Sequence, residues 1–94
     1  MAREYTQRLS QEEKRARLLD AIARNYKDGY AEIYREELMD EASLTRSQFE
    51  KTLPRMKEEG LVEAEERFSE EYGQSVATRY VITKDGWRFL AENG

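Results

Sequence analysis

Apolar residues recur at helical spacing in the middle of the chain, in the run TRSQFEKTLPRMKEEGL that begins at Thr45. Those at positions i, i+4 and i+7, on one face of the expected helix, are Phe49, Leu53 and Met56. Thr45 and Gln48 have the spacing of a capping box, which places the start of the helix at this threonine. Glycine commonly ends a helix, so Gly60 marks the expected C-terminus of this one. The pattern predicts a helix over residues 45–59.

A second helical pattern lies near the N-terminus. Ser10 and Glu13 again have capping-box spacing, so a helix is expected over residues 11–26. Its apolar face consists of Leu18, Leu19, Ile22, Ala23 and Tyr26. Residues 1–9 show no period and are expected to form a flexible arm. The remaining residues, 10–94, are expected to form one domain.

The segment before the central helix is shorter and less regular. Residues 30–34, YAEIY, alternate as a short strand does, although their apolar members also fit one face of a helix. We favour a short strand or an extended turn here. A brief helix is expected over residues 35–42, with Leu38 and Ala42 facing inward. Ser43 and Leu44 then connect it to the central helix.

Two stretches after the central helix alternate between apolar and polar residues. They cover residues 61–68 and 76–82, and the polar loop SEEYGQS over residues 69–75 lies between them. Alternation with period two on both sides of a polar loop predicts a β-hairpin.

The last helix is expected over residues 84–92, with Thr83 as its N-cap. Trp87 and Leu90 have the spacing of an inward face. Gly86, which has no side chain, is expected to let this helix approach the sheet closely.

Composition excludes several classes of protein. The chain of 94 residues has neither cysteine nor histidine. Disulfides and thiolate metal sites are therefore impossible, and the commonest general base is missing. The carboxylates fall mostly in charge runs typical of solvated surfaces. We expect no enzyme, no catalytic residues, no metal and no cofactor. With no membrane-spanning run and no signal-peptide core, the expected location is the cytoplasm, with no membrane partner.

The central helix is basic although the protein is acidic, with a formal net charge of −4. Residues 45–57 contain one anion, Glu50, and four cations, namely Arg46, Lys51, Arg55 and Lys57. Such a concentrated positive helix indicates a negatively charged partner such as nucleic acid. The alternative is that Arg46 and Lys51 only form surface ion pairs with Glu36 or Glu50.

Two segments carry a resemblance to a known family. The run REELMDEASLTRSQFEKTLPRMKEEGLVE resembles the helix-turn-helix of winged-helix transcription regulators, and YVITKDGWRFL is similar to the Tyr-x-Leu-Thr-x-x-Gly segment that follows their wing. Within that family the sequence looks closest to small archaeal and MarR- or PadR-like regulators. The resemblance implies an α+β winged helix, with a three-helix bundle containing the helix-turn-helix, a two-stranded β-hairpin wing and a C-terminal helix. Pro54 departs from the pattern and is expected to kink the central helix rather than end it.

The resemblance also implies a function, which is to bind double-stranded DNA and regulate transcription as a homodimer. The central helix would lie in the major groove, where Arg can contact guanine and Gln adenine. The expected base contacts are Arg46, Ser47, Gln48 and Lys51, and the expected phosphate contacts are Arg55, Arg67 and Arg79. The dimer interface is expected to use Tyr5, Leu9 and apolar residues of the first or last helix.

A second interpretation comes from the wing. Its loop carries Glu70 and Glu71, which phosphate would repel. Winged-helix domains also serve as protein-interaction modules, and an acidic wing suits a basic protein partner. A continuous basic face would favour DNA, whereas isolated cations ringed by acids would favour a protein.

Overall fold

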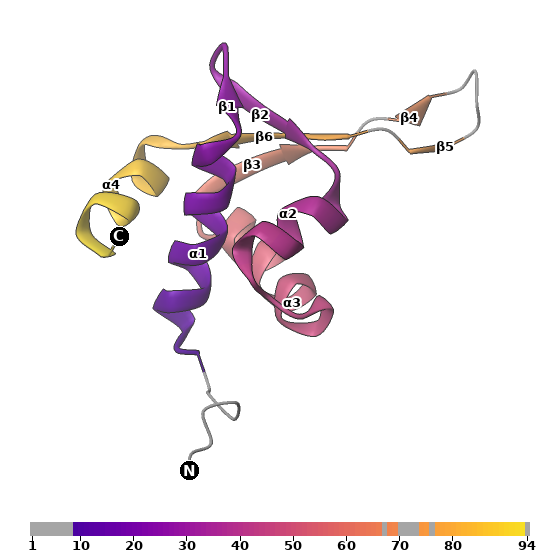
Figure 1. The fold of residues 1–94 in the computed structure, drawn as a ribbon. Coiled ribbons are helices and arrows are strands. Elements are labelled where there is room, and N and C mark those ends of the chain that lie inside the picture. Colours follow the sequence, from indigo (N-terminus) through magenta and orange to yellow (C-terminus); the bar gives the residue numbers. More distant parts are fainter. Residues whose placement is uncertain (1–8, 67, 70–73, 76, 94) are drawn as a thin grey trace.

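A computed structural model describes residues 9–66, 68–69, 74–75 and 77–93 as a small α+β domain (Figure 1). The helices are α1 (Gln11–Arg24), α2 (Arg35–Ala42), α3 (Arg46–Glu58) and α4 (Lys84–Asn93). The strands are β1 (Tyr26–Lys27), β2 (Tyr30–Ile33), β3 (Val62–Glu65), β4 (Phe68–Ser69), β5 (Gln74–Ser75) and β6 (Thr78–Ile82). This is the order of elements expected from the sequence, with one additional strand, β1. The expected hairpin consists of two strand pairs, β3 with β6 and β4 with β5.

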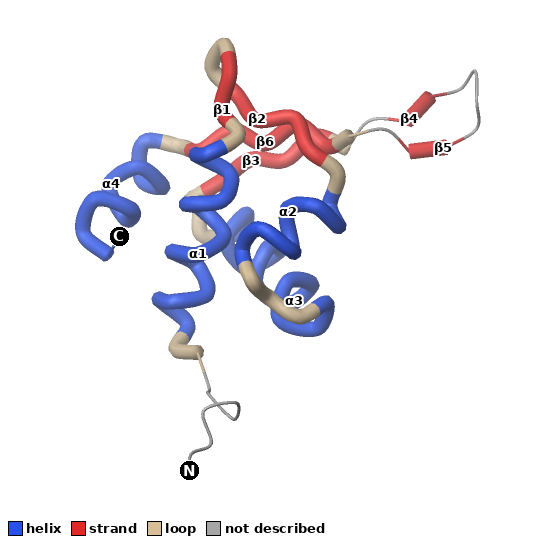
Figure 2. Tube along the Cα trace, viewed as in Figure 1, coloured by secondary structure: helices blue, strands red, loops and turns tan. Residues whose placement is uncertain are grey.

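Four strands form an antiparallel sheet in the order β1-β2-β6-β3, and the helices lie on one side of it (Figure 2). β6 is central: Tyr80 pairs with Ala31 of β2 and with Ala64 of β3. Alternate residues of β6 are buried, as expected for a sheet with one face on the core. Beyond this sheet β4 pairs with β5, which confirms the expected hairpin but extends its strands to Ser69, Gln74 and Ser75, residues that were predicted as loop.

α1 is the centre of the core and packs against the other three helices and β6. Leu18, Leu19 and Ile22 are fully buried, which confirms most of the predicted apolar face. Leu9, assigned to the arm, instead packs against this core. The rest of the expected arm lies outside the described residues. The longest helix in the described residues is α1, which has 14 residues and several charged side chains. None of the described helices is long and apolar enough to cross a membrane.

The first helix ends two residues earlier than predicted. Tyr26 and Lys27 leave it to form β1, which pairs with β2. Asp28 and Gly29 make the two-residue turn between these strands with φ angles of 59° and 94°. Positive φ at both positions matches the twist of a tight hairpin, and an Asp-Gly pair accepts it readily. The expected short strand over residues 30–34 is confirmed as β2.

α3 is one residue shorter at each end than the predicted helix over residues 45–59, because Thr45 and Glu59 are its N-cap and C-cap. Thr45 forms a complete capping box with Gln48. At the other end Gly60 has a φ of 77°, and Leu61 donates a backbone hydrogen bond of 2.9 Å to the Met56 carbonyl, which closes the helix. The helix continues through Pro54, as expected.

α4 lies close to the sheet because of Gly86. A Cβ atom on this residue would stand 2.1 Å from the Leu61 carbonyl oxygen. Thr83 caps the helix, since its hydroxyl accepts a 3.0 Å hydrogen bond from the Gly86 N–H. The prediction that Trp87 faces inward is wrong: its ring forms a T-shaped pair with the Tyr26 ring at 5.3 Å between centroids, but the residue remains 43% exposed. With Gly86 turned to the sheet, the next residue is rotated about 100° away from it.

A bidentate ion pair joins α1 to the end of α3. Arg15 Nε and Nη2 donate to the two Glu59 carboxylate oxygens at 2.8 and 2.6 Å, and the arginine side chain is 13% exposed. Hydrogen bonding to Glu59 raises the pKa of the Arg15 guanidinium above its ordinary value.

We expect Arg15→Ala to lower the free energy of unfolding by about 1–2 kcal/mol, because Glu59 loses both of its donors in a partly buried position. Arg24→Ala is the matched control. Its pair with Asp20 is 3.3 Å long and more than half exposed, so the loss should stay below about 0.5 kcal/mol. Urea denaturation measures both, and equal losses would contradict the assignment.

Candidate nucleic-acid interface

α3 is buried along one face and exposed along the other. The buried side chains are Phe49, Thr52, Leu53 and Met56. The opposite side presents Ser47, Lys51 and Pro54 to solvent, with Arg55 at its margin. The apolar stripe therefore fixes the rotation of the helix and makes these polar residues a ridge on the surface.

Three cations on α3 form no ion pair within the part of the chain that the structure describes. Lys51, Arg55 and Lys57 are exposed, and none forms an ion pair with any residue that the structure describes. The prediction of a basic helix surface is therefore confirmed for these three. The alternative in which Lys51 pairs with a nearby glutamate is not seen among the described residues.

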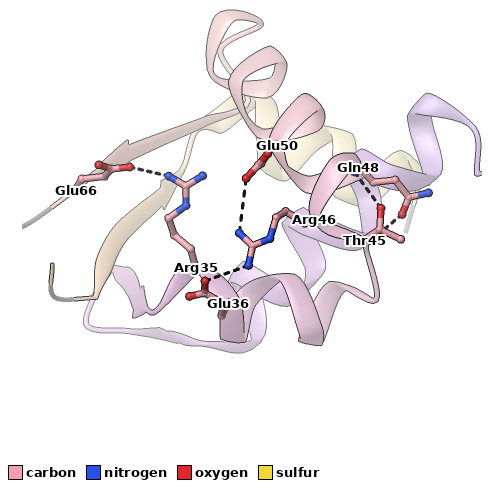
Figure 3. A network of polar contacts seen from close by, with 7 residues as sticks. All are labelled: Arg35, Glu36, Thr45, Arg46, Gln48, Glu50 and Glu66. Carbon is pink, nitrogen blue, oxygen red and sulfur yellow. Dashed lines mark hydrogen bonds and ion pairs between the residues drawn. The ribbon is translucent and has the colours of Figure 1, made fainter.

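Arg46 differs from these three cations because it forms ion pairs with two glutamates (Figure 3). Its Nη2 donates to Glu36 Oε2 of α2 at 3.3 Å, and its Nη1 lies 3.7 Å from Glu50 Oε2, one turn further along α3. The side chain is nevertheless 63% exposed. For this residue the alternative surface ion pairs expected from the sequence are present.

Gln48 is occupied by the helix cap. Its side-chain oxygen accepts the Thr45 N–H at 2.9 Å, while the Thr45 hydroxyl accepts the Gln48 N–H at 3.1 Å (Figure 3). A bidentate contact with adenine needs both the oxygen and the nitrogen of the amide. The oxygen of Gln48 already accepts the Thr45 N–H, so a bidentate contact with adenine would share this oxygen with the cap.

A hollow of about 300 Å³ lies between α2 and α3 beside Arg46. Its lining residues are Arg35, Glu36, Met39, Arg46, Phe49 and Glu50. The Arg35 guanidinium lies 5.5 Å from the centroid of the Phe49 ring. It also pairs with Glu66 at 2.8 Å (Figure 3). Sequence reasoning did not assign Arg35 to the site. Its position next to a buried aromatic depends on packing between two helices.

Arg79 does not join the cations of α3. Its neighbours Thr78 and Tyr80 point into the core, so Arg79 lies on the sheet face turned away from the helices. In register it stands between Glu32 and Glu65, and its guanidinium lies 4.4 Å from the centroid of the Tyr30 ring. Of the other predicted wing residues, Arg67, Glu70 and Glu71 lie outside the described residues.

Neither a metal-binding cluster in the described residues nor a similar protein indicates another functional site. The described part of the chain contains no group of three or more acidic, histidine or cysteine side chains that could hold a metal ion. Comparisons with protein-family models, curated proteins and solved structures gave no match. The assignment of function therefore depends on the fold and on the surface of α3.

Proposed function

We propose that the chain is a winged-helix domain that binds double-stranded DNA through α3 and regulates transcription. Three features of the fold support this. α2 and α3 are consecutive helices joined by the three residues 43–45, as in a helix-turn-helix. The hairpin that contains β3 to β6 follows directly, in the position of a wing, and α4 closes the domain against α1.

The observation that carries the proposal is the set of exposed cations on α3 that pair with no acid among the described residues. The chain has a formal charge of −4, yet Lys51, Arg55 and Lys57 are exposed on one helix without acidic partners among the described residues. Phosphate groups are the partner that such a surface attracts most strongly. An acidic protein with one basic helix is suited to a defined contact with DNA rather than to general coating.

The dimensions of α3 fit the major groove. A 13-residue helix is about 20 Å long and about 10–12 Å across its side chains, and the groove is about 12 Å wide. In this placement Ser47 and Lys51 face the base edges, and Arg55 lies towards the phosphates. Arg79 is left out, because it lies on the far face of the sheet.

The homodimer stays a prediction from the sequence. Tyr5 lies outside the described residues, and Leu9 is used in the core. Trp87 on α4 leaves 43% of its side chain exposed and is an apolar surface that a second copy would cover. Two half-sites would double the contacts that one α3 can make.

Equilibrium binding to a labelled duplex of mixed sequence, measured across a salt series, tests the proposal. We expect affinity to fall with a log–log slope of about −3, the value for three to four neutralised phosphates. A single strand of the same length should bind with a shallower slope. No binding at a salt concentration of about 20 mM would contradict the proposal, since screening is weakest there.

One observation favours a second candidate, a protein-interaction module with a basic partner. On the open face of the sheet Arg79 stands between Glu32 and Glu65, and Glu63 is exposed on the same strand as Glu65. A cation ringed by acids in this way is the arrangement expected of a surface that binds a protein. Absence of DNA binding would make this face the next surface to test.

A further inference from the structure

The two terminal nitrogens of Arg46 are both engaged in the free domain. One meets Glu36 at 3.3 Å and the other meets Glu50 at 3.7 Å (Figure 3). A bidentate contact with guanine, or a strong contact with a phosphate, needs these same nitrogens. Contact with DNA therefore competes with both glutamates for the guanidinium of Arg46.

We propose that Glu36 and Glu50, here called the acidic clasp, hold Arg46 away from DNA and so limit the affinity of the domain. The inference rests on the proposed function and adds a regulating role for two residues outside the expected DNA contacts. The clasp is built from two elements, since Glu36 belongs to α2 and Glu50 to α3. The clasp and Arg46 together carry a net charge of −1, so the two glutamates offset the attraction of this arginine for phosphate.

The geometry allows the clasp to open without a change in the backbone. The side chains of Arg46, Glu36 and Glu50 are 63%, 70% and 54% exposed, so each can turn into solvent. Both contacts are longer than the 2.6–2.8 Å of the Arg15–Glu59 pair. Exposed pairs of this kind change an equilibrium by a factor of about one to five each. Phosphate or guanine can therefore compete with the clasp, at a loss of affinity.

The decisive variant is Glu36→Gln/Glu50→Gln, which keeps the shape of both side chains and removes their charge. We expect its affinity for the mixed-sequence duplex to rise about three- to tenfold, because Arg46 no longer has to break two ion pairs. Removing acids near DNA also weakens general repulsion, so a control with the same change in charge is required. Glu37→Gln/Asp40→Asn supplies it on α2, where both side chains are exposed and pair with no cation in the described part of the chain.

The same clasp substitutions in an Arg46→Ala background separate the two effects. A role through Arg46 requires the gain to disappear there, to within about twofold, whereas general repulsion would act with or without the arginine. Circular dichroism and thermal unfolding of every variant establish that the fold is intact.

A gain confined to the background that contains Arg46, and absent in the control pair, supports the acidic clasp. An equal gain in the control, an equal gain without Arg46, or weaker binding of the clasp variant overturns it. In those three cases the wild-type protein still binds DNA with its salt dependence, so the proposed function stands. If neither the wild type nor any variant binds, the proposed function fails and the clasp fails with it.

Discussion

Replacing Lys51 and Arg55 by glutamate is expected to weaken duplex binding by about a hundredfold or more while leaving the fold unchanged. Each cation is exposed on α3 without an acidic partner among the described residues, so its contact with DNA replaces no ion pair. Losing one such contact reduces affinity by about 1–3 kcal/mol, and a carboxylate in its place adds repulsion. The slope of the salt dependence should also decrease by about one, because the phosphate contact of Arg55 is lost.

The matched control is Lys27→Glu/Lys84→Glu. It makes the same change in net charge on β1 and α4, and both lysines are exposed and lie outside α3. Its affinity should decrease by less than about fivefold, through the change in overall charge alone. If both double variants lose binding equally, α3 is not the contact surface. If both bind as the wild type does, the basic helix has no part in binding.

Replacing Gly86 by alanine is expected to lower the free energy of unfolding by about 3 kcal/mol, the second large effect. The new Cβ atom would lie 2.1 Å from the Leu61 carbonyl oxygen and 2.7 Å from Ile82 Cγ2, so α4 would have to move off the sheet. At an unhindered helix position the same change stabilises by about 1 kcal/mol. Denaturant unfolding therefore tests the sign as well as the size of the effect.

Gly60→Ala is the control for this prediction. Its φ is 77° but nothing lies within 4 Å of the added Cβ atom, so only backbone strain is introduced. That strain is worth about 1 kcal/mol. A loss for Gly86→Ala no greater than for Gly60→Ala would show that α4 does not approach the sheet this closely.

Features that depend on neighbouring residues in the chain were predictable. The start and end of α3 follow from the Thr45 capping box and from Gly60, which act over three or four residues. The alternating strands of the hairpin and the close approach at Gly86 were also expected. β1 was missed because Asp28-Gly29 ends a helix and turns a hairpin equally well, and the sequence at Tyr26 fits the face of either element.

The candidate site was predictable in part for the same reason. The apolar stripe of α3 determines which of its residues face solvent, so its spacing alone predicts that Ser47, Lys51 and Arg55 lie on the surface, and all three are exposed. Gln48 fits the cap spacing as well, but spacing does not show that the cap occupies the amide oxygen that a base contact would need.

By itself, the sequence determined the helices, the hairpin and the basic character of α3, because periodicity, caps and charge are local properties. Only the tertiary structure decided which cations are available. Glu36 reaches Arg46 because α2 turns back beside α3, and Arg79 stands between Glu32 and Glu65 because β6 lies between β2 and β3. An ion pair forms where two charges meet in space, and the meeting of distant segments is set by packing and strand register rather than by local sequence.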